Sequence, residues 1–303
     1  MSIDIYLAAL AAAVVWGIDP VLSKRGMAYG GHALQAAFAV ITVGTIIFWS
    51  ALYITQGLDA ILSISPRIAL IFLGGGILGT TIGRISFYIG IDKVGASIAG
   101  IGASTLPAFA AILALFLLSE PLSTIHSAGI LLVVVGLSLL ATSKGGNISG
   151  WSFQDLVLPV FAGFAFGLGQ VIRRFGLVET PATVLQAIAL NDTAAFVGLF
   201  LFLFIFRRDL LRPPSLPATG YFIAAGIVSS VCLFLAFTAL DLGPVAIVST
   251  LISTAGLFTV LLSFLFLRDL ERITQKVVIG ALFVAFGAGI MIYFKFSPPD
   301  SIS

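Results

Sequence analysis

Three charged residues lie well inside apolar stretches of this sequence: Asp19, Arg84 and Asp192. A charged side chain at the depth of a membrane is costly, so it is kept where it faces protein, water or a ligand. We therefore expect Arg84 to bind an anionic group, and Asp19 or Asp192 to bind a cationic group or to carry a proton. Two structural alternatives stay open: Arg84 and Asp192 neutralise each other, or Asp19 lies near the interface and caps a helix.

Polar and aromatic neighbours extend this candidate site. Pro20 follows Asp19 and removes a backbone donor, so a helix interrupted there leaves backbone groups free for a substrate. Gln170 stands in the second half of the chain where Pro20 stands in the first, and it either binds substrate or joins two helices. The expected substrate-binding residues are Trp16, Asp19, Arg84, Tyr88, Gln170, Asn191 and Asp192.

The residues that most catalytic or metal sites require are scarce. The chain has one cysteine, Cys232, and two histidines, His32 and His126. It contains no HExxH motif, no Gly-rich phosphate loop and no nucleophile paired with a base at a familiar spacing. We expect no enzyme activity, no metal site and no cofactor.

The composition defines the solvent in which these residues must be held. Of 303 residues, 59% are hydrophobic and 9% are charged, whereas soluble domains have about 25% charged residues. A soluble fold could not cover so much apolar surface, so the chain must lie in lipid. The net charge of +2 is too small to suggest a nucleic-acid partner. At about 20 residues per span, the length holds roughly ten transmembrane helices.

Runs without charge locate these helices. Residues 26–58, 94–119, 121–143, 213–240, 242–267 and 277–294 contain no Asp, Glu, Lys or Arg. The other apolar stretches are 3–23, 68–91, 155–175 and 184–206. The start of the chain has no basic signal region, so we predict that the first stretch is a retained helix. Cations near helix ends are expected to anchor lipid headgroups, and the alternative is that they line an entrance: Lys24, Arg25, Arg173 and Arg174.

An internal repeat organises the chain. Gly17 pairs with Gly167, and Lys24 with Arg174, each at an offset of 150. Further pairs at offsets of 148 to 151 follow in the same order: Gln35 with Gln186, Gly95 with Gly243, Glu120 with Glu271, Gly129 with Gly280, and Gly136 with Gly287. An ordered series of this kind predicts two copies of one unit, at residues 1–147 and 150–303.

Each copy contains an odd number of helices, so the second copy must cross the membrane inverted. The predicted fold is an all-α integral membrane protein of ten transmembrane helices in two inverted five-helix repeats. Inverted repeats are typical of secondary transporters, in which the substrate pathway lies between the two copies.

These features resemble the drug/metabolite transporter superfamily and, within it, the ten-helix EamA-like family. The resemblance rests on Trp16-Gly17 with Lys24, on Gly95-Ala96, on Leu106-Pro107-Ala108-Phe109, on Glu120-Pro121-Leu122-Ser123 and on the glycines of the fifth and tenth helices. It implies transport of a metabolite, without indicating which. The sequence departs from the pattern at Asp19-Pro20, and Ala255 stands near the place that Pro107 has in the first copy.

The favoured function is secondary transport of a small polar or amphipathic metabolite, such as an amino acid or related organic ion, across the plasma membrane. The alternative is a flippase for a lipid- or polyprenyl-linked headgroup. The expected partners are the small-molecule substrate, membrane lipids and either a coupling proton or a counter-substrate. An enclosed aqueous cavity would favour the transporter, and a lateral opening towards lipid would favour the flippase.

Overall fold

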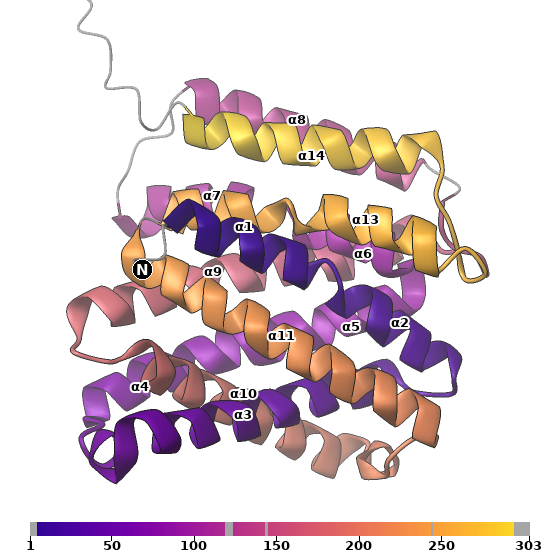
Figure 1. Cartoon of the computed structure of the whole chain (residues 1–303). Helices are drawn as coiled ribbons and strands as arrows, with labels where there is room; N and C mark the ends of the chain where they lie inside the picture. Colours follow the sequence, from indigo (N-terminus) through magenta and orange to yellow (C-terminus); the bar gives the residue numbers. More distant parts are fainter. Residues whose placement is uncertain (1–4, 119–123, 143–144, 244, 294–303) are drawn as a thin grey trace, which may run out of the picture.

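The computed structural model describes residues 5–118, 124–142, 145–243 and 245–293. In these ranges the chain forms a bundle of α-helices with one short antiparallel β pair (Figure 1). Seven of the described helices are long and apolar enough to cross a membrane by themselves, and further apolar helices are shorter. The prediction of an all-α integral membrane protein is confirmed.

The first half makes five helical passages in the described residues. These are α1 (Ile5–Trp16) with α2 (Asp19–Ala28), α3 (Ala33–Leu62), α4 (Pro66–Gly75) with η1 (Gly76–Thr81) and α5 (Ile82–Val94), α6 (Ala96–Ala103) with α7 (Leu106–Leu118), and α8 (Thr124–Ala141). The strand β1 (Gly146–Asn147) follows.

The second half repeats this order. A short 3-10 turn, η2 (Phe153–Leu156), leads into α9 (Val157–Glu179), and α10 (Val184–Phe206) follows. After η3 (Arg208–Leu211) come α11 (Leu216–Leu242), α12 (Val245–Ser253) with α13 (Ala255–Phe266), β2 (Glu271–Arg272) and α14 (Gln275–Tyr293). Consecutive passages alternate in direction, so α9 runs opposite to α1 and α2 (Figure 1).

Several passages are interrupted, and in the described residues the interruptions match between the halves only in the fourth and ninth passages. The first passage is interrupted between Trp16 and Asp19, and Pro20 lies in the first turn of α2. Proline has no N–H to continue the ladder of the preceding helix, so the predicted interruption at Asp19-Pro20 has a simple cause. The fourth and ninth passages are each broken once, between α6 and α7 and between α12 and α13. The third passage is different, because η1 is a stretch of π-helix.

The packing has a pseudo-two-fold axis. Trp16 and Phe166 occupy matching positions of the repeat, and their rings meet edge to face with centroids 5.5 Å apart. Matching glycines of the repeat also pack symmetrically, in α8 and α14. A Cβ on Gly136 would lie 2.8 Å from the carbonyl oxygen of Gly280, and one on Gly287 would lie 2.7 Å from that of Gly129. The two copies therefore pack against each other as matched halves.

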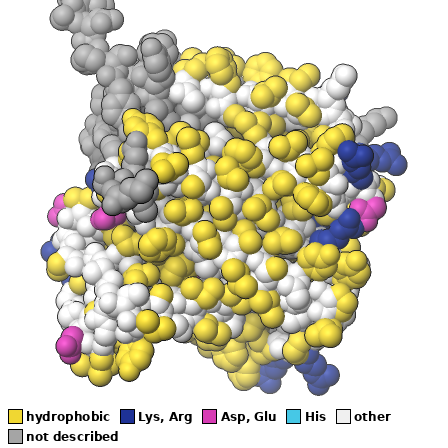
Figure 2. All heavy atoms as spheres, viewed as in Figure 1, with side chains coloured by type: hydrophobic (Ala, Val, Ile, Leu, Met, Phe, Trp, Pro, Cys, Tyr) yellow, Lys and Arg dark blue, Asp and Glu magenta, His cyan; other side chains and the backbone are white. Residues whose placement is uncertain are grey.

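The two halves are interleaved. The strongest packing joins helices of different halves: α8 with α14, α1 with α11, α3 with α10 and α5 with α9. The β pair adds a further link, since Gly146 pairs with Arg272 and Asn147 with Glu271. The face of the bundle seen in Figure 2 is largely apolar, with charged side chains at its edges. Exposed side chains such as Ile54 and Leu216, at 79% and 86% exposure, are suited to contact with lipid.

Two of the expected headgroup anchors are buried. Lys24 donates from Nζ to the carbonyls of Ile91 and Asp92, both at 3.2 Å, at the end of α5. Arg173 is only 6% exposed and lies inside the bundle. Their expected role as anchors is therefore wrong. The matched Arg174 bonds the carbonyls of Leu240 and Asp241 at 2.5 and 2.9 Å, so Lys24 and Arg174 make equivalent contacts in the two copies.

Candidate functional site

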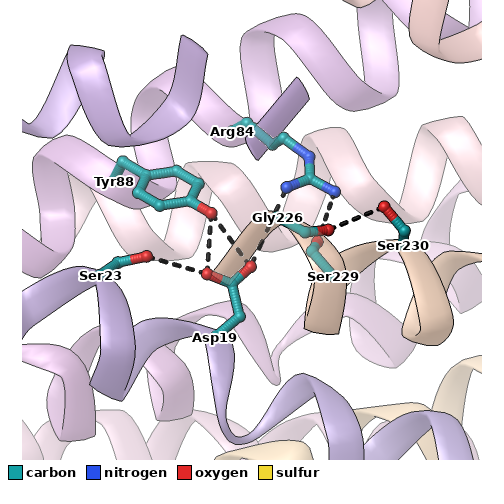
Figure 3. Close-up of polar contacts among 7 residues, drawn as sticks. All are labelled: Asp19, Ser23, Arg84, Tyr88, Gly226, Ser229 and Ser230. Atoms are coloured by element: carbon teal, nitrogen blue, oxygen red, sulfur yellow. Dashed lines mark hydrogen bonds and ion pairs between the residues drawn. The ribbon is translucent and has the colours of Figure 1, made fainter. Parts of the chain in front are cut away.

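Asp19 is the centre of a buried polar cluster (Figure 3). The helix break places it at the first residue of α2, where it is 1% exposed. Ser23, one turn further along α2, donates from Oγ to Asp19 Oδ1 at 3.0 Å. The hydroxyl of Tyr88 on α5 donates to the same carboxylate, 2.8 Å from Oδ1 and 3.0 Å from Oδ2. The carboxylate thus faces the third passage and does not cap its helix.

Arg84 lies beside this carboxylate. It precedes Tyr88 by four residues in α5, so the two side chains lie on one face of the helix. Its NH1 is 4.0 Å from Asp19 Oδ2, and its NH2 donates to Ser229 Oγ of α11 at 2.9 Å. The cluster therefore joins the first half to the second (Figure 3). Within the described ranges, the Ser229 bond is the only hydrogen bond of a guanidinium that has five N–H donors.

A small cavity adjoins Arg84. Its volume is about 20 Å³, which is room for one water molecule. Gln170 of α9 reaches this cavity, and its Oε1 is buried without a hydrogen-bond partner in the part of the chain that the structure describes. The lining residues come from both halves: Trp16, Arg84, Gln170, Arg173, Ser229, Cys232, Leu233, Ala236, Phe237 and Leu240.

A second polar cluster borders the same cavity. Arg173 of α9 donates from Nε to Asn191 Oδ1 at 3.1 Å and from NH2 to Thr80 Oγ1 at 2.6 Å. Asn191 donates to the same Thr80 oxygen at 2.8 Å and to Asp192 Oδ1 at 3.2 Å. Arg173 also lies over the ring of Phe237, 5.2 Å from its centroid. Thr80 belongs to the π-helical stretch η1, and such stretches are common at functional sites.

The structure brings the sequence-predicted residues into two adjoining groups. Asp19, Arg84 and Tyr88 form the first cluster, and Trp16 and Gln170 line the cavity beside it. Asn191 and Asp192 belong to the second cluster. Among the described residues Arg84 forms an ion pair with Asp19 and none with Asp192, but the charges of Arg84 and Asp192 still act on each other, so their mutual neutralisation stays an open alternative. Asp19 is buried in the bundle, so the alternative in which it caps a helix near the interface is wrong.

Four further polar residues of the site were not predicted: Ser23, Thr80, Arg173 and Ser229. Ser229 and Thr80 are ordinary hydroxyl residues in apolar helices, and nothing in their type or spacing distinguishes them from packing residues. Arg173 carried a usable signal, because it occurs at offset 150 from Ser23, which contacts Asp19. That signal was hidden because Arg173 stands next to Arg174 near the end of a helix.

A buried carboxylate outside the membrane-spanning helices holds the framework of the site. Glu271, in β2, is 3% exposed and accepts hydrogen bonds from the N–H of Ala96, and from the N–H and hydroxyl of Ser97 at 3.1 and 2.5 Å. It therefore caps α6 from the other half of the chain. Burial raises the pKa of Glu271 above its ordinary value, and the bonds from Ser97 and Ala96 oppose that effect in part. The matched motif at Glu120 lies outside the described residues.

Comparisons with known proteins agree with this architecture. The sequence model of the EamA-like transporter family matches residues 4–142 and 154–293. The WAT1-related protein At3g02690, chloroplastic, of Arabidopsis thaliana is 28% identical over 168 residues, which are 53% of this chain and 38% of that protein. The match thus spans well under half of the plant protein. A protein of known crystal structure superposes with a TM-score of 0.68 over 96% of both chains at 17% identity, a likeness of fold.

Proposed function

The chain belongs to the EamA-like transporter family, and on this premise we propose that it is a secondary transporter that works by alternating access. It is an integral membrane protein, and membership of the family makes it a carrier of small solutes. We place it in the plasma membrane. The substrate is a small polar or amphipathic metabolite with an anionic group, such as an amino acid or related organic ion.

One observation carries this proposal: Arg84 and Gln170 line the same cavity, and both have unused hydrogen-bonding capacity among the described residues. Arg84 has N–H donors without acceptors among the described residues, and the Gln170 Oε1 has no donor. A buried polar atom without a partner costs about 1–3 kcal/mol, so such atoms at a cavity suggest a missing ligand. A substrate anion would satisfy Arg84, and an N–H or O–H of the substrate would satisfy Gln170.

The apolar part of the substrate has its own surroundings. Trp16, Leu233 and Phe237 line the cavity beside the polar atoms. At about 20 Å³ the cavity is far smaller than the roughly 300 Å³ or more of usual ligand sites, so substrate entry requires the helices around it to separate. Its walls come from both halves, so a rocking motion of one half against the other would widen it.

Transport by the reconstituted protein tests the proposal. Proteoliposomes containing wild type are supplied with a labelled pool of amino acids and phosphorylated metabolites, and the uptake of each compound is compared with that of Arg84→Ala. Loss of the guanidinium should reduce uptake at least tenfold, since a charged hydrogen bond contributes about 1.5–3 kcal/mol. Arg268→Ala is the matched control, because Arg268 is exposed and bonds only its own helix in the described residues.

Each outcome has a defined meaning. Uptake by wild type and Arg268→Ala that is lost in Arg84→Ala supports a site between the halves. Equal uptake by all three proteins would show that Arg84 is structural and that the site lies elsewhere. If wild type moves no compound of the pool but transfers a labelled lipid phosphate between leaflets, the flippase alternative replaces the transporter.

A further inference from the structure

Asp19 and Arg84 form an ion pair that is incomplete. The carboxylate accepts hydrogen bonds from two hydroxyls: Ser23 Oγ lies 3.0 Å from Oδ1, and the Tyr88 hydroxyl lies 2.8 Å from Oδ1 and 3.0 Å from Oδ2. The guanidinium remains 4.0 Å from the nearest carboxylate oxygen. Asp19 is thus held mainly by neutral hydroxyls, and Arg84 is turned partly towards Ser229 and the cavity (Figure 3).

An anionic substrate would compete with Asp19 for this guanidinium. Two carboxylates close to one buried cation leave a net negative charge in a region of low dielectric constant, where unscreened repulsion amounts to several kcal/mol at about 4 Å. When two carboxylates share a site, the usual resolution is that one of them takes up a proton. The hydroxyls of Ser23 and Tyr88 suit this change, because a hydroxyl can rotate to donate to a carboxylate or to accept from a carboxylic acid.

We propose that Asp19 is the proton-binding residue of this transporter, and that it takes up one proton for each substrate anion bound at Arg84. This inference rests on the proposed transport function and adds the identity of the coupling ion. The proton comes from the solution on the side where substrate enters, stays on the Asp19 carboxyl while Arg84 holds the substrate, and leaves with the substrate on the opposite side. No covalent bond other than the O–H bond forms or breaks.

The other charged and titratable groups near Asp19 do not replace it in this role. Arg84 and Tyr88 face it from α5, and Cys232 of α11 lines the cavity together with Arg84. Arg173 of α9 and Asp192 of α10 belong to the second cluster, where Asn191 contacts both. Lys24 of α2 is bonded to the end of α5. The helices α6 and α13, which also pack against α2, contain no titratable side chain. Among the described carboxylates, Asp192 is therefore the buried one near the cavity that must be compared with Asp19.

Substrate accumulation against a pH gradient tests the proposal. Full-length protein is reconstituted, the membrane potential is held at zero with valinomycin and equal potassium, and the probe is the compound of the labelled pool that wild type carries fastest. A pH difference of about one unit should drive accumulation up to about tenfold, because tenfold in proton activity corresponds to about 1.4 kcal/mol. A pH-sensitive dye inside the vesicles should report one proton for each substrate molecule.

Asp19→Asn imitates the protonated carboxyl and should separate substrate movement from proton movement. We expect it to retain measurable exchange of labelled for unlabelled substrate, to accumulate none against the gradient, and to give no dye signal. Asp19→Glu, which can still titrate, should keep the accumulation. Asp192→Asn is the matched control, and its proton-to-substrate ratio should stay at that of wild type whatever its rate.

Other results would overturn the proposal. Wild-type transport without a dye signal would exclude proton coupling and leave the transport function standing. Tenfold accumulation by Asp19→Asn, or loss of coupling in Asp192→Asn alone, would exclude Asp19 as the proton site. If Asp19→Asn shows no exchange, the dye signals of wild type and Asp19→Glu decide between the outcomes. One proton per substrate in both proteins would support Asp19 as the proton site, and no dye signal in either would exclude it. If wild type carries no compound of the pool, both this inference and the transporter proposal fail.

Discussion

At the scale of single residues, Gln170 is placed in a way that favours function over stability. Gln170 lines the cavity, and its buried Oε1 has no donor in the described part of the chain. We expect Gln170→Leu to raise the free energy of unfolding by about 1–2 kcal/mol, because an unsatisfied buried polar atom is removed. The same change should reduce substrate uptake severalfold. Thermal unfolding in detergent and uptake in vesicles measure the two effects.

Gln186 is the matched control for this prediction. It is also a buried glutamine, but its Oε1 accepts from the N–H of Thr183 and its Nε2 donates to the carbonyl of Ala60 at 2.6 Å. Gln186→Leu should therefore lower the stability by about 1–3 kcal/mol. If the two leucine variants shift the melting temperature in the same direction, the missing partner of Gln170 is supplied by something other than substrate.

At the scale of elements, the third and sixth passages meet at two glycines next to the site. A Cβ on Gly79 would lie 2.6 Å from the Cα of Gly169, so the helices there touch through their backbones. Gly79→Ala should push α9 away from η1 and destabilise the protein by about 1–3 kcal/mol. Because Arg173 lies 3.1 Å from the same added atom, substrate uptake should also fall.

Gly74 provides a control in the same passage. An added Cβ there meets no atom within 4 Å, so Gly74→Ala should leave the packing intact and gain about 0.5–1 kcal/mol from a stiffer unfolded chain. Melting temperatures of the two alanine variants should move in opposite directions. A Gly79→Ala protein as stable as wild type would mean that α9 and η1 can separate without cost.

The sequence predicted some of these elements and missed others, for physical reasons. The break in the first passage was predictable, because Pro20 acts through its own covalent geometry. The π-helical turn was not, because it depends on how Gly76 and Gly79 pack against α10 and α9, and no local residue preference encodes that contact. Thr80 was missed with it, since its hydroxyl becomes a partner of Arg173 only when the turn is in place.

At the scale of the whole molecule, one carboxylate fastens the two halves together. Glu271 of the second half caps α6 of the first, and burial raises its pKa in the folded protein. A raised pKa means that the folded state binds the proton more tightly than the unfolded state does, so this contribution to stability is present in acid and is lost as the pH rises. Glu271→Gln cannot titrate at this position.

The measurable quantity is the difference in melting temperature between wild type and Glu271→Gln. The melting temperature of wild type should fall relative to that of Glu271→Gln as the pH rises from about 4, near the pKa of the unfolded residue, through the raised pKa of the folded one. A difference that is constant or grows with pH over this interval would contradict the direction of the shift.

The repeat was the most informative global signal in the sequence. The pairs Gly129 with Gly280 and Gly136 with Gly287 were found by their spacing alone, and in the structure they form two equivalent contacts between α8 and α14. The partners of the buried charges could not be found in this way. Asp19, Tyr88 and Ser229 meet through three passages, and an offset shows which residues are equivalent, not which are in contact. The division of the chain at residues 147 and 150 stays a prediction.

The interleaving of the halves has a consequence for how the protein is made. Most of the tightest helix pairs join residues separated by about a whole repeat or more, such as α8 with α14 and α1 with α11. At about 5–20 residues per second, synthesis of the second copy takes on the order of 10 s. During that interval the first five helices wait in the bilayer, with Arg84 still lacking Ser229. The insertion machinery, or a chaperone beside it, must therefore stabilise a partly assembled bundle in which charged side chains still lack their partners from the second copy.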